Sequence, residues 1–107
     1  MKKIRIGSKE KIHFIGIGGI GMSGLAQVMH RMGFNVQGSD LSNSRNVERC
    51  RRIKIKVFSR HSRVNLKDAT IVVRSSAIKN NNPEIIAAKK EELKFLKEQK
   101  CWAMWYP

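Results

Sequence analysis

Short apolar runs alternate with amphipathic stretches along most of the chain. Four runs rich in branched apolar side chains predict buried strands, at residues 11–17, 34–39, 55–58 and 70–73. Between the first two, apolar residues recur at helical spacing, which predicts a helix whose buried face holds Met22, Leu25, Ala26, Met29 and Met32. Gly33 follows at the position where a glycine commonly ends a helix.

The pattern predicts two more helices and leaves the end of the chain open. A second helix is expected after an N-cap residue among positions 42–44. Pro83 suits the first turn of a third helix, over residues 84–92. Beyond it, propensity favours one long helix over residues 83–100, whereas a short apolar run favours a fifth strand at residues 93–96.

Strands that alternate with helices predict an α/β fold, a doubly wound parallel sheet with right-handed crossovers. The chain has 107 residues, of which 41% are hydrophobic and 28% charged, an ordinary globular balance. It contains no internal repeat and no visible boundary. We therefore expect a single domain spanning residues 1–107, with its core at about residues 11–100.

Basic residues greatly outnumber acidic ones, with 22 Lys and Arg against 8 Asp and Glu and a formal net charge of +14. Such a charge attracts anionic partners, and a nucleic-acid-binding module is one hypothesis. The basic residues are scattered, however, and the few aromatic residues do not interleave with them as in a stacking surface. We therefore favour a solvated basic surface over a nucleic-acid site.

The cysteines and histidines do not show the spacing of a zinc site. Cys50 and Cys101 lie far apart, and two free thiols are typical of a reducing compartment. The longest uncharged run, residues 14–29, is too short and too rich in glycine to span a membrane. The basic start of the chain does not lead into a signal peptide. We expect a cytoplasmic protein with no metal site and no membrane partner.

A glycine-rich loop is the most informative segment. Gly16, Gly18 and Gly21 form a GxGxxG pattern directly after the first predicted strand and at the start of the first helix. The first glycine permits a tight turn, the second lets a phosphate approach the backbone, and the third lets the helix pack against the sheet. Free N–H groups and the dipole at the helix start favour a diphosphate, with the Ser23 hydroxyl as a further donor.

Asp40, at the end of the second predicted strand, extends this pattern, because an acid at that place binds ribose hydroxyls in NAD-binding domains. Ligands of such sheets lie where the strand order reverses. Ser75, Ser76 and Ala77, after the fourth strand, are therefore expected either to line the same crevice or to form a plain polar turn. The residues predict a Rossmann-like nucleotide-diphosphate site and do not distinguish NAD from other nucleotides.

Three segments resemble the N-terminal domain of the Mur ligase family. They are IHFIGIGGIGMSGLAQVM at residues 12–29, GSD at residues 38–40, and RSSAIKNNNPE at residues 74–84. The resemblance runs from about Lys11 to Ala88 and fades after it. It is closest to the ligases that add L-alanine to UDP-N-acetylmuramic acid in peptidoglycan synthesis, and it implies the UDP-sugar-binding domain of such an ATP-dependent enzyme.

The resemblance also implies how the site is divided. The diphosphate of UDP-N-acetylmuramic acid would be held by Gly16, Gly18, Gly19, Ile20, Gly21, Met22 and Ser23. The nucleoside side would be formed by Ser39, Asp40, His61, Ser75, Ser76 and Ala77. ATP and Mg²⁺ are implied for the full-length ligase only, since this chain has no GxxxxGK[ST] loop and no catalytic residue is assigned. The chain alone is expected to be inactive, with the remaining ligase domains as partners.

Two residues depart from the family pattern, because Arg52 and Arg60 stand where the family has glycine. Arginine takes a positive φ far less readily than glycine and is bulkier, so these two positions leave the third-strand region and the role of His61 as open questions. Other hypotheses stay open. Under these hypotheses the chain is an NAD-binding regulatory or oxidoreductase domain, a nucleic-acid-binding module, or a fragment that folds and binds nothing.

Overall fold

The computed structural model describes residues 7 and 9–105, without the side chains of residues 103–105. Most of the basic start of the chain, which we had considered as a signal-peptide beginning, lies outside the described residues. Within the described part of the chain, no helix has the length and apolar character needed to cross a membrane.

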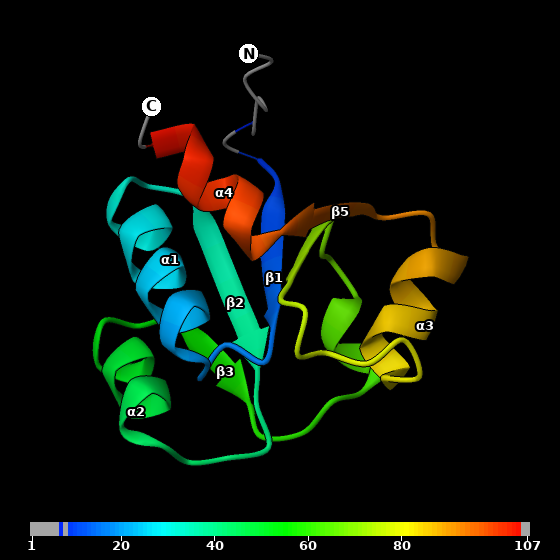
Figure 1. Ribbon diagram of the computed structural model, residues 1–107, viewed down its shortest axis with the longest axis horizontal. Helices are drawn as coiled ribbons and strands as arrows, with labels where there is room; N and C mark the ends of the chain where they lie inside the picture. Colours follow the sequence, from blue (N-terminus) through cyan, green and yellow to red (C-terminus); the bar gives the residue numbers. More distant parts are fainter. Residues whose placement is uncertain (1–6, 8, 106–107) are drawn as a thin grey trace.

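Five parallel strands form the sheet in the described part of the chain, in the order β3-β2-β1-β4-β5 (Figure 1). They are β1 (Lys11–Ile15), β2 (Asn35–Ser39), β3 (Lys56–Phe58), β4 (Ile71–Arg74) and β5 (Lys94–Lys97). β1 is central, since it pairs with β2 on one side and with β4 on the other. The strand order reverses between β1 and β4, and β3 and β5 are the edges. The predicted doubly wound α/β sheet is confirmed.

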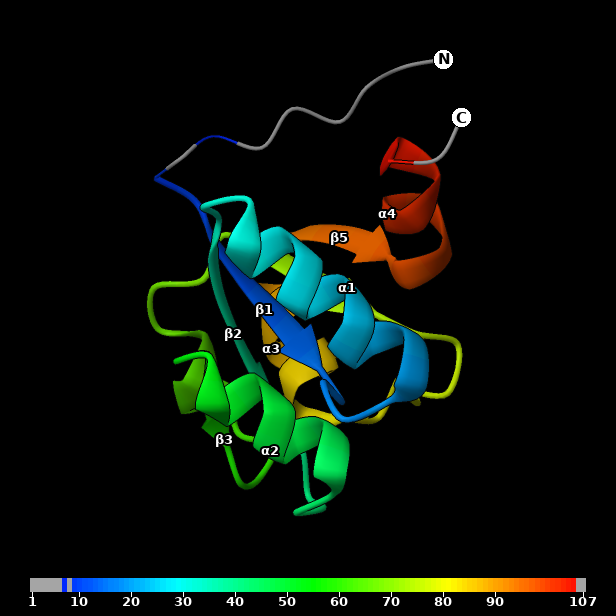
Figure 2. The ribbon, with the colours of Figure 1, turned by 90° about the vertical axis from the view of Figure 1, so that its left-hand side faces the viewer.

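Helices cover both faces of this sheet. α1 (Ile20–Arg31) and α2 (Arg45–Arg52) lie in front of the sheet in Figure 2, and α3 (Pro83–Lys90) lies behind it. The short 3-10 helix η1 (Arg63–Leu66) packs with α3, and α4 (Glu98–Trp105) packs beside α1. The connection from β3 to β4 therefore carries the chain from one face of the sheet to the other.

Alternation along the strands sends neighbouring side chains into two separate cores. Ile12 and Phe14 of β1 are fully buried in the cluster beneath α1, whereas Ile15 belongs to the cluster beneath α3. Full burial of one such side chain stabilises the fold by about 1.5–3 kcal/mol. His13 lies between Ile12 and Phe14 in the sequence and is also fully buried. The central strand thus carries a polar side chain into the interior.

The helix boundaries follow the predicted signals. Gly33, with φ +95°, ends α1, as expected for a glycine after the last turn. Of the three candidate N-caps of α2, Ser44 fills the role, and its side chain accepts from the Val47 N–H at 3.4 Å. Pro83 opens α3 as predicted, and the Asn82 side chain caps it.

The end of the chain contains both a strand and a helix. The predicted single helix over residues 83–100 is wrong, because the chain leaves the helical conformation at Glu92, where φ is +56°. β5 forms next, so the alternative of a fifth strand is confirmed. α4 then begins directly at Glu98.

Arg52 and Arg60, which the sequence analysis singled out, do not adopt the left-handed backbone conformation. Arg52 is the last helical residue of α2, and Arg60 lies after β3. Within the described residues, the positive φ angles outside glycine belong to Lys54 (74°) and Glu92 (56°). Neither Arg52 nor Arg60 therefore has the positive φ that would strain its backbone. The left-handed residue that ends α2 is Lys54.

Replacing Lys54 by glycine is expected to stabilise the protein by about 0.5–1 kcal/mol, because it removes the steric cost of a left-handed side-chain residue. Arg52→Gly is the matched control, and it should instead destabilise by a similar amount, since it puts glycine into a helical turn. Urea unfolding followed by circular dichroism measures both changes. Changes in the free energy of unfolding that have the same sign in both variants would contradict a left-handed Lys54 and a helical Arg52.

Candidate functional site

The glycine loop between β1 and α1 is fastened to the neighbouring strand. Gly16 has φ +76°, a conformation that suits glycine. The N–H groups of Gly16 and Ile17 both donate to the Ser39 carbonyl oxygen, at 2.8 and 3.0 Å. The first glycine therefore turns the chain over the carboxyl end of β2, as the sequence pattern predicts.

Two side chains form hydrogen bonds with the backbone N–H and carbonyl groups of Gly18. Its N–H donates to Asp40 Oδ2 at 2.8 Å, and its carbonyl oxygen accepts from Asn46 Nδ2 at 3.1 Å. Asp40 Oδ1 in turn accepts from the N–H and the hydroxyl of Ser42, both at 2.8 Å. A Cβ on Gly18 would lie 2.7 Å from Asp40 Oδ2. Glycine is therefore required here by the protein's own packing.

The first turn of α1 presents unpaired donors. The N-cap residue, Gly19, has no side chain to cap the helix, and the first turn contains no acidic residue. The N–H groups of Ile20, Gly21 and Met22 have no acceptor among the described residues. Together with the positive end of the helix dipole, these three donors make an anion-binding surface.

A pocket of about 330 Å³ opens at the carboxyl ends of β4 and β5, on the same edge of the sheet as the loop. Arg74 and Lys97 give its lining positive charge, and Ser75, Ser76 and Glu98 also line it. The Arg74 guanidinium is held in place by Asn80 Oδ1 at 2.9 Å. This pocket lies between the ends of β4 and β5, one strand away from the reversal of strand order between β1 and β4, and it contains two basic side chains.

A buried carboxylate organises the other side of the sheet. Glu84, in the first turn of α3, is fully buried. Its Oε1 lies 2.7 Å from His13 Nε2 and accepts from the Ser39 hydroxyl at 2.6 Å. Its Oε2 accepts from Asn65 Nδ2 at 2.7 Å and from the Ser62 N–H at 3.1 Å. Four donor positions from three parts of the chain, β1, β2 and the η1 segment, thus surround one carboxylate.

Burial alone would raise the pKa of the Glu84 carboxyl, because it penalises the charged form. Its contacts with His13, and then the hydrogen bonds from Ser39 and Asn65, outweigh burial and hold the pKa below the ordinary value of 4.5. Glu84 is therefore ionised at neutral pH. A buried ion of this kind is tolerated only where its hydrogen bonds are satisfied.

His61 is oriented by the same cluster. Its Nδ1 lies 2.8 Å from the Ser39 hydroxyl oxygen. Because that hydroxyl donates to Glu84, it accepts from the His61 Nδ1–H. In the neutral ring this leaves Nε2 as an acceptor. His61 also lines a groove of about 860 Å³ between η1 and α3, on the face of the sheet opposite α1.

The structure groups the sequence-predicted residues into two places. Gly18 of the loop is hydrogen-bonded to Asp40, and Ser75 and Ser76 line the pocket at the ends of β4 and β5, whereas Ala77 does not. Ser39 and His61 lie in the Glu84 cluster.

The Ser23 hydroxyl donates to the Ile20 carbonyl oxygen at 3.3 Å, and its side chain is buried. Met22 is also buried, so only its backbone faces the edge.

Sequence reasoning missed the residues that brace the site. Glu84, His13, Gln37 and Asn65 form the buried cluster, and Asn46 holds the loop. One signal was available, because His13 and Gln37 stand as polar residues inside two predicted buried strands. The pairing of His13 with Glu84 joins residues distant in sequence, which local patterns do not reveal. Among the described residues, no group of three or more His, Cys, Asp or Glu side chains is placed to hold a metal ion.

The chain was compared with known proteins. The sequence model described as "Mur ligase family, catalytic domain" matches residues 11–104. UDP-N-acetylmuramate–L-alanine ligases of Pelagibacter ubique and Xanthobacter autotrophicus are 59% and 58% identical to it, over 89% and 77% of this chain. The crystal structure of the UDP-N-acetylmuramate–alanine ligase of Thermotoga maritima superposes with a TM-score of 0.82, at 35% identity over 86% of this chain.

These comparisons also set the extent of the match. The chain spans 20% and 17% of the two ligase sequences and 21% of the solved chain. The family match continues to residue 104, so our expectation that the resemblance ends near Ala88 was wrong. β5 and α4 form the matched end of the chain. The chain belongs to the Mur ligase family.

Proposed function

We propose that this chain is the domain of a UDP-N-acetylmuramate–L-alanine ligase that binds the UDP part of UDP-N-acetylmuramic acid. The observation that carries the proposal is the first turn of α1, where the N–H groups of Ile20, Gly21 and Met22 are unpaired. Such a turn binds the oxygens of a diphosphate through charge-assisted hydrogen bonds. The ligases of Pelagibacter ubique and Xanthobacter autotrophicus, to which the chain is similar, are named for this substrate.

The surroundings of the turn support the same ligand. Arg74 and Lys97 line the adjoining pocket and favour an anion. Asp40 and Asn46 fix the Gly18 peptide, so the turn is already ordered before a ligand arrives. Preorganised donors bind more tightly, because little conformational entropy is lost on binding. In this proposal Asp40 supports the loop, and Ser39 and His61 mark the nucleoside side.

The ligase reaction itself belongs to the longer protein. ATP and Mg²⁺ would be held by a GxxxxGK[ST]-type loop, which the 107 residues do not contain. The function proposed for this chain is therefore to bind the UDP-sugar substrate in the cytoplasm and to present it to the remaining ligase domains. Its net charge of +14 favours an anionic ligand such as a phosphorylated sugar nucleotide.

Titration of the purified chain tests the proposal. UDP-N-acetylmuramic acid should bind measurably by calorimetry and shift the amide resonances of residues 18–23. NAD, the other nucleotide diphosphate that fits the sequence pattern, is the control and should bind more weakly. Preference for NAD, or shifts centred elsewhere, would overturn the proposal. A DNA duplex in the same assay tests the nucleic-acid alternative, whose affinity should fall steeply with salt.

A further inference from the structure

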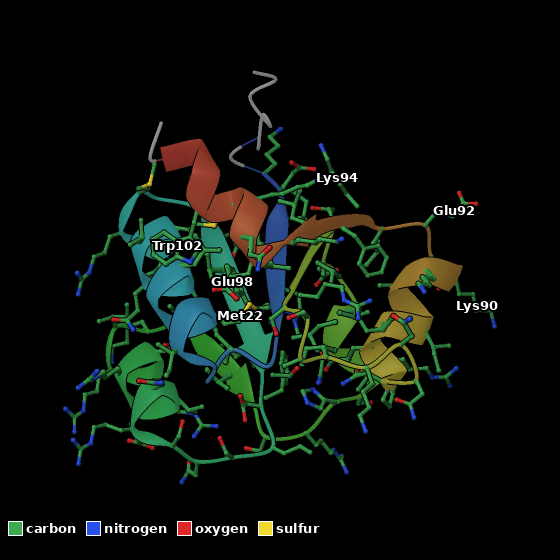
Figure 3. The ribbon with its side chains drawn as sticks, viewed as in Figure 1. Met22, Lys90, Glu92, Lys94, Glu98 and Trp102 are labelled. Atoms are coloured by element: carbon green, nitrogen blue, oxygen red, sulfur yellow. The ribbon has the colours of Figure 1, made fainter. Side chains whose placement is uncertain are left out.

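The carboxylate of Glu98 lies against the first turn of α1. Glu98 is the first residue of α4 and follows β5 directly. Its Oε1 is 1.6 Å from the position that a Cβ would take on Gly21, and its Cδ is 2.7 Å from that position. In Figure 3, Glu98 points from α4 towards α1, near Met22. The carboxylate thus fills the space that the glycine leaves open.

This part of α1 attracts negative charge and has none of its own. The first turn contains no acidic residue, and three of its N–H groups have no acceptor among the described residues. Glu98 supplies a carboxylate from the opposite end of the chain. The helix dipole favours an anion in this position by simple electrostatics.

The half-buried Glu98 carboxylate is not fixed by a charged or hydrogen-bonding partner among the described residues, although Arg74 and Lys97 line the same pocket. The negative charge of Glu98 nevertheless acts on a neighbouring side chain in α4. Burial, and after it the negative charge of Glu98, raise the pKa of the Cys101 thiol to about 11. The carboxylate is therefore a local anion that no partner holds in place.

We propose that Glu98 is an internal competitor for the diphosphate, which must turn its carboxylate away from Gly21 when the UDP-sugar binds. The inference rests on the proposed function, because it concerns the same first turn of α1. Two anions cannot share this turn without strong repulsion, since both are partly removed from water. Glu98 therefore lowers the affinity of the site and sets how readily a diphosphate enters it.

Glu98→Gln tests the competition, because it removes the charge and keeps the shape. We expect binding of UDP-N-acetylmuramic acid to become roughly tenfold tighter, equivalent to about 1.4 kcal/mol. Glu92→Gln is the matched control (Figure 3), since Glu92 is exposed in the connection between α3 and β5 and loses the same charge. Its affinity should stay within about twofold of the parent, as expected for a distant, solvent-screened charge. A gain in affinity cannot arise from partial unfolding.

Two outcomes overturn the proposal. One is an affinity of Glu98→Gln equal to or weaker than that of the parent protein. The other is equal tightening in Glu98→Gln and Glu92→Gln, which would reflect net charge alone. If neither parent nor variant binds the UDP-sugar, the proposed function fails instead. Inorganic pyrophosphate then decides the competition, since it should bind more tightly to Glu98→Gln, and no binding by either protein overturns this inference too.

A measurement without ligand gives an independent check. The amide resonances of Ile20, Gly21 and Met22 should differ between the parent and Glu98→Gln at neutral pH, because the variant removes a charge that lies against Gly21 in the same helical turn. The same resonances should be unchanged in Glu92→Gln. Identical positions in the parent and Glu98→Gln would show that the carboxylate does not lie at this turn, and would overturn the proposal.

Discussion

Glu84→Gln should destabilise the folded protein by about 3–5 kcal/mol, the cost of breaking a buried, hydrogen-bonded charge cluster. The Glu84 carboxylate is fully buried, and the polar groups around it act as hydrogen-bond donors. They are the Ser39 hydroxyl, Asn65 Nδ2, the Ser62 N–H and His13 Nε2, the last at 2.7 Å. A glutamine places an N–H₂ group against some of these donors. At least one buried polar group then stays unsatisfied, which is expensive in a dry interior.

Urea unfolding at pH 7 measures this loss, with Glu91→Gln as the matched control. Glu91 is exposed at the end of the same helix, so its variant should change the stability by less than about 0.5 kcal/mol, as is usual for surface positions. A loss below about 1 kcal/mol in Glu84→Gln would show that the cluster adapts to a neutral side chain.

The effect of Glu84 should also depend on pH. The pKa of Glu84 in the folded protein lies below its ordinary value of 4.5. Its charge therefore contributes stability that is fully present above about pH 4.5 and is lost as the pH falls through the lower folded-state pKa. The stability difference between the parent and Glu84→Gln should shrink correspondingly on acidification. A difference that stays constant down to pH 3 would exclude an ionised Glu84.

Gly18→Val should abolish binding of the UDP-sugar, with a loss of at least about 100-fold. A Cβ at this position would lie 2.7 Å from Asp40 Oδ2 and 2.9 Å from Val47 Cγ2. Asp40 cannot yield easily, because Gly18 and Ser42 hold both of its oxygens. The loop must shift instead and carry the first turn of α1 with it. Losing one or two hydrogen bonds to a charged ligand costs about 3 kcal/mol, or about 100-fold in affinity.

Calorimetry and circular dichroism together separate the loss of binding from unfolding. Gly24→Ala, in the middle of α1, is the control, because its Cβ would make an ordinary contact with Trp102 at 3.5 Å. It should bind the UDP-sugar as the parent does. Normal affinity in a folded Gly18→Val protein would remove the loop from the binding site.

The sequence was informative wherever one local rule decided the outcome. Apolar runs located the strands, Gly33 and Pro83 marked the ends of helices, and the glycine pattern placed the loop at the switch between β1 and β4. The tail was ambiguous because its residues favour a helix, and only pairing with β4 makes residues 94–97 a strand. Such pairing is a tertiary effect that overrides local propensity.

The residues that support the site could not be predicted either, because their contacts also depend on tertiary structure. The sequence placed Glu84 only at the start of the third predicted helix, and nothing local connects it with His13 in β1. Asp40 was expected to meet a ribose, yet its two oxygens bond the loop and Ser42. Glu98 approaches Gly21 only because α4 packs beside α1. Each contact depends on the folded arrangement of elements far apart in the chain.

The two edge strands bear on how the protein behaves when concentrated. An open strand edge presents unpaired backbone groups that can recruit a second molecule and start aggregation. β3 is only three residues long and begins at Lys56, and β5 has Lys94 and Lys97 at its two ends. All three lysines are exposed. Bringing two such edges together would crowd like charges, so these lysines protect the isolated domain against edge-to-edge association.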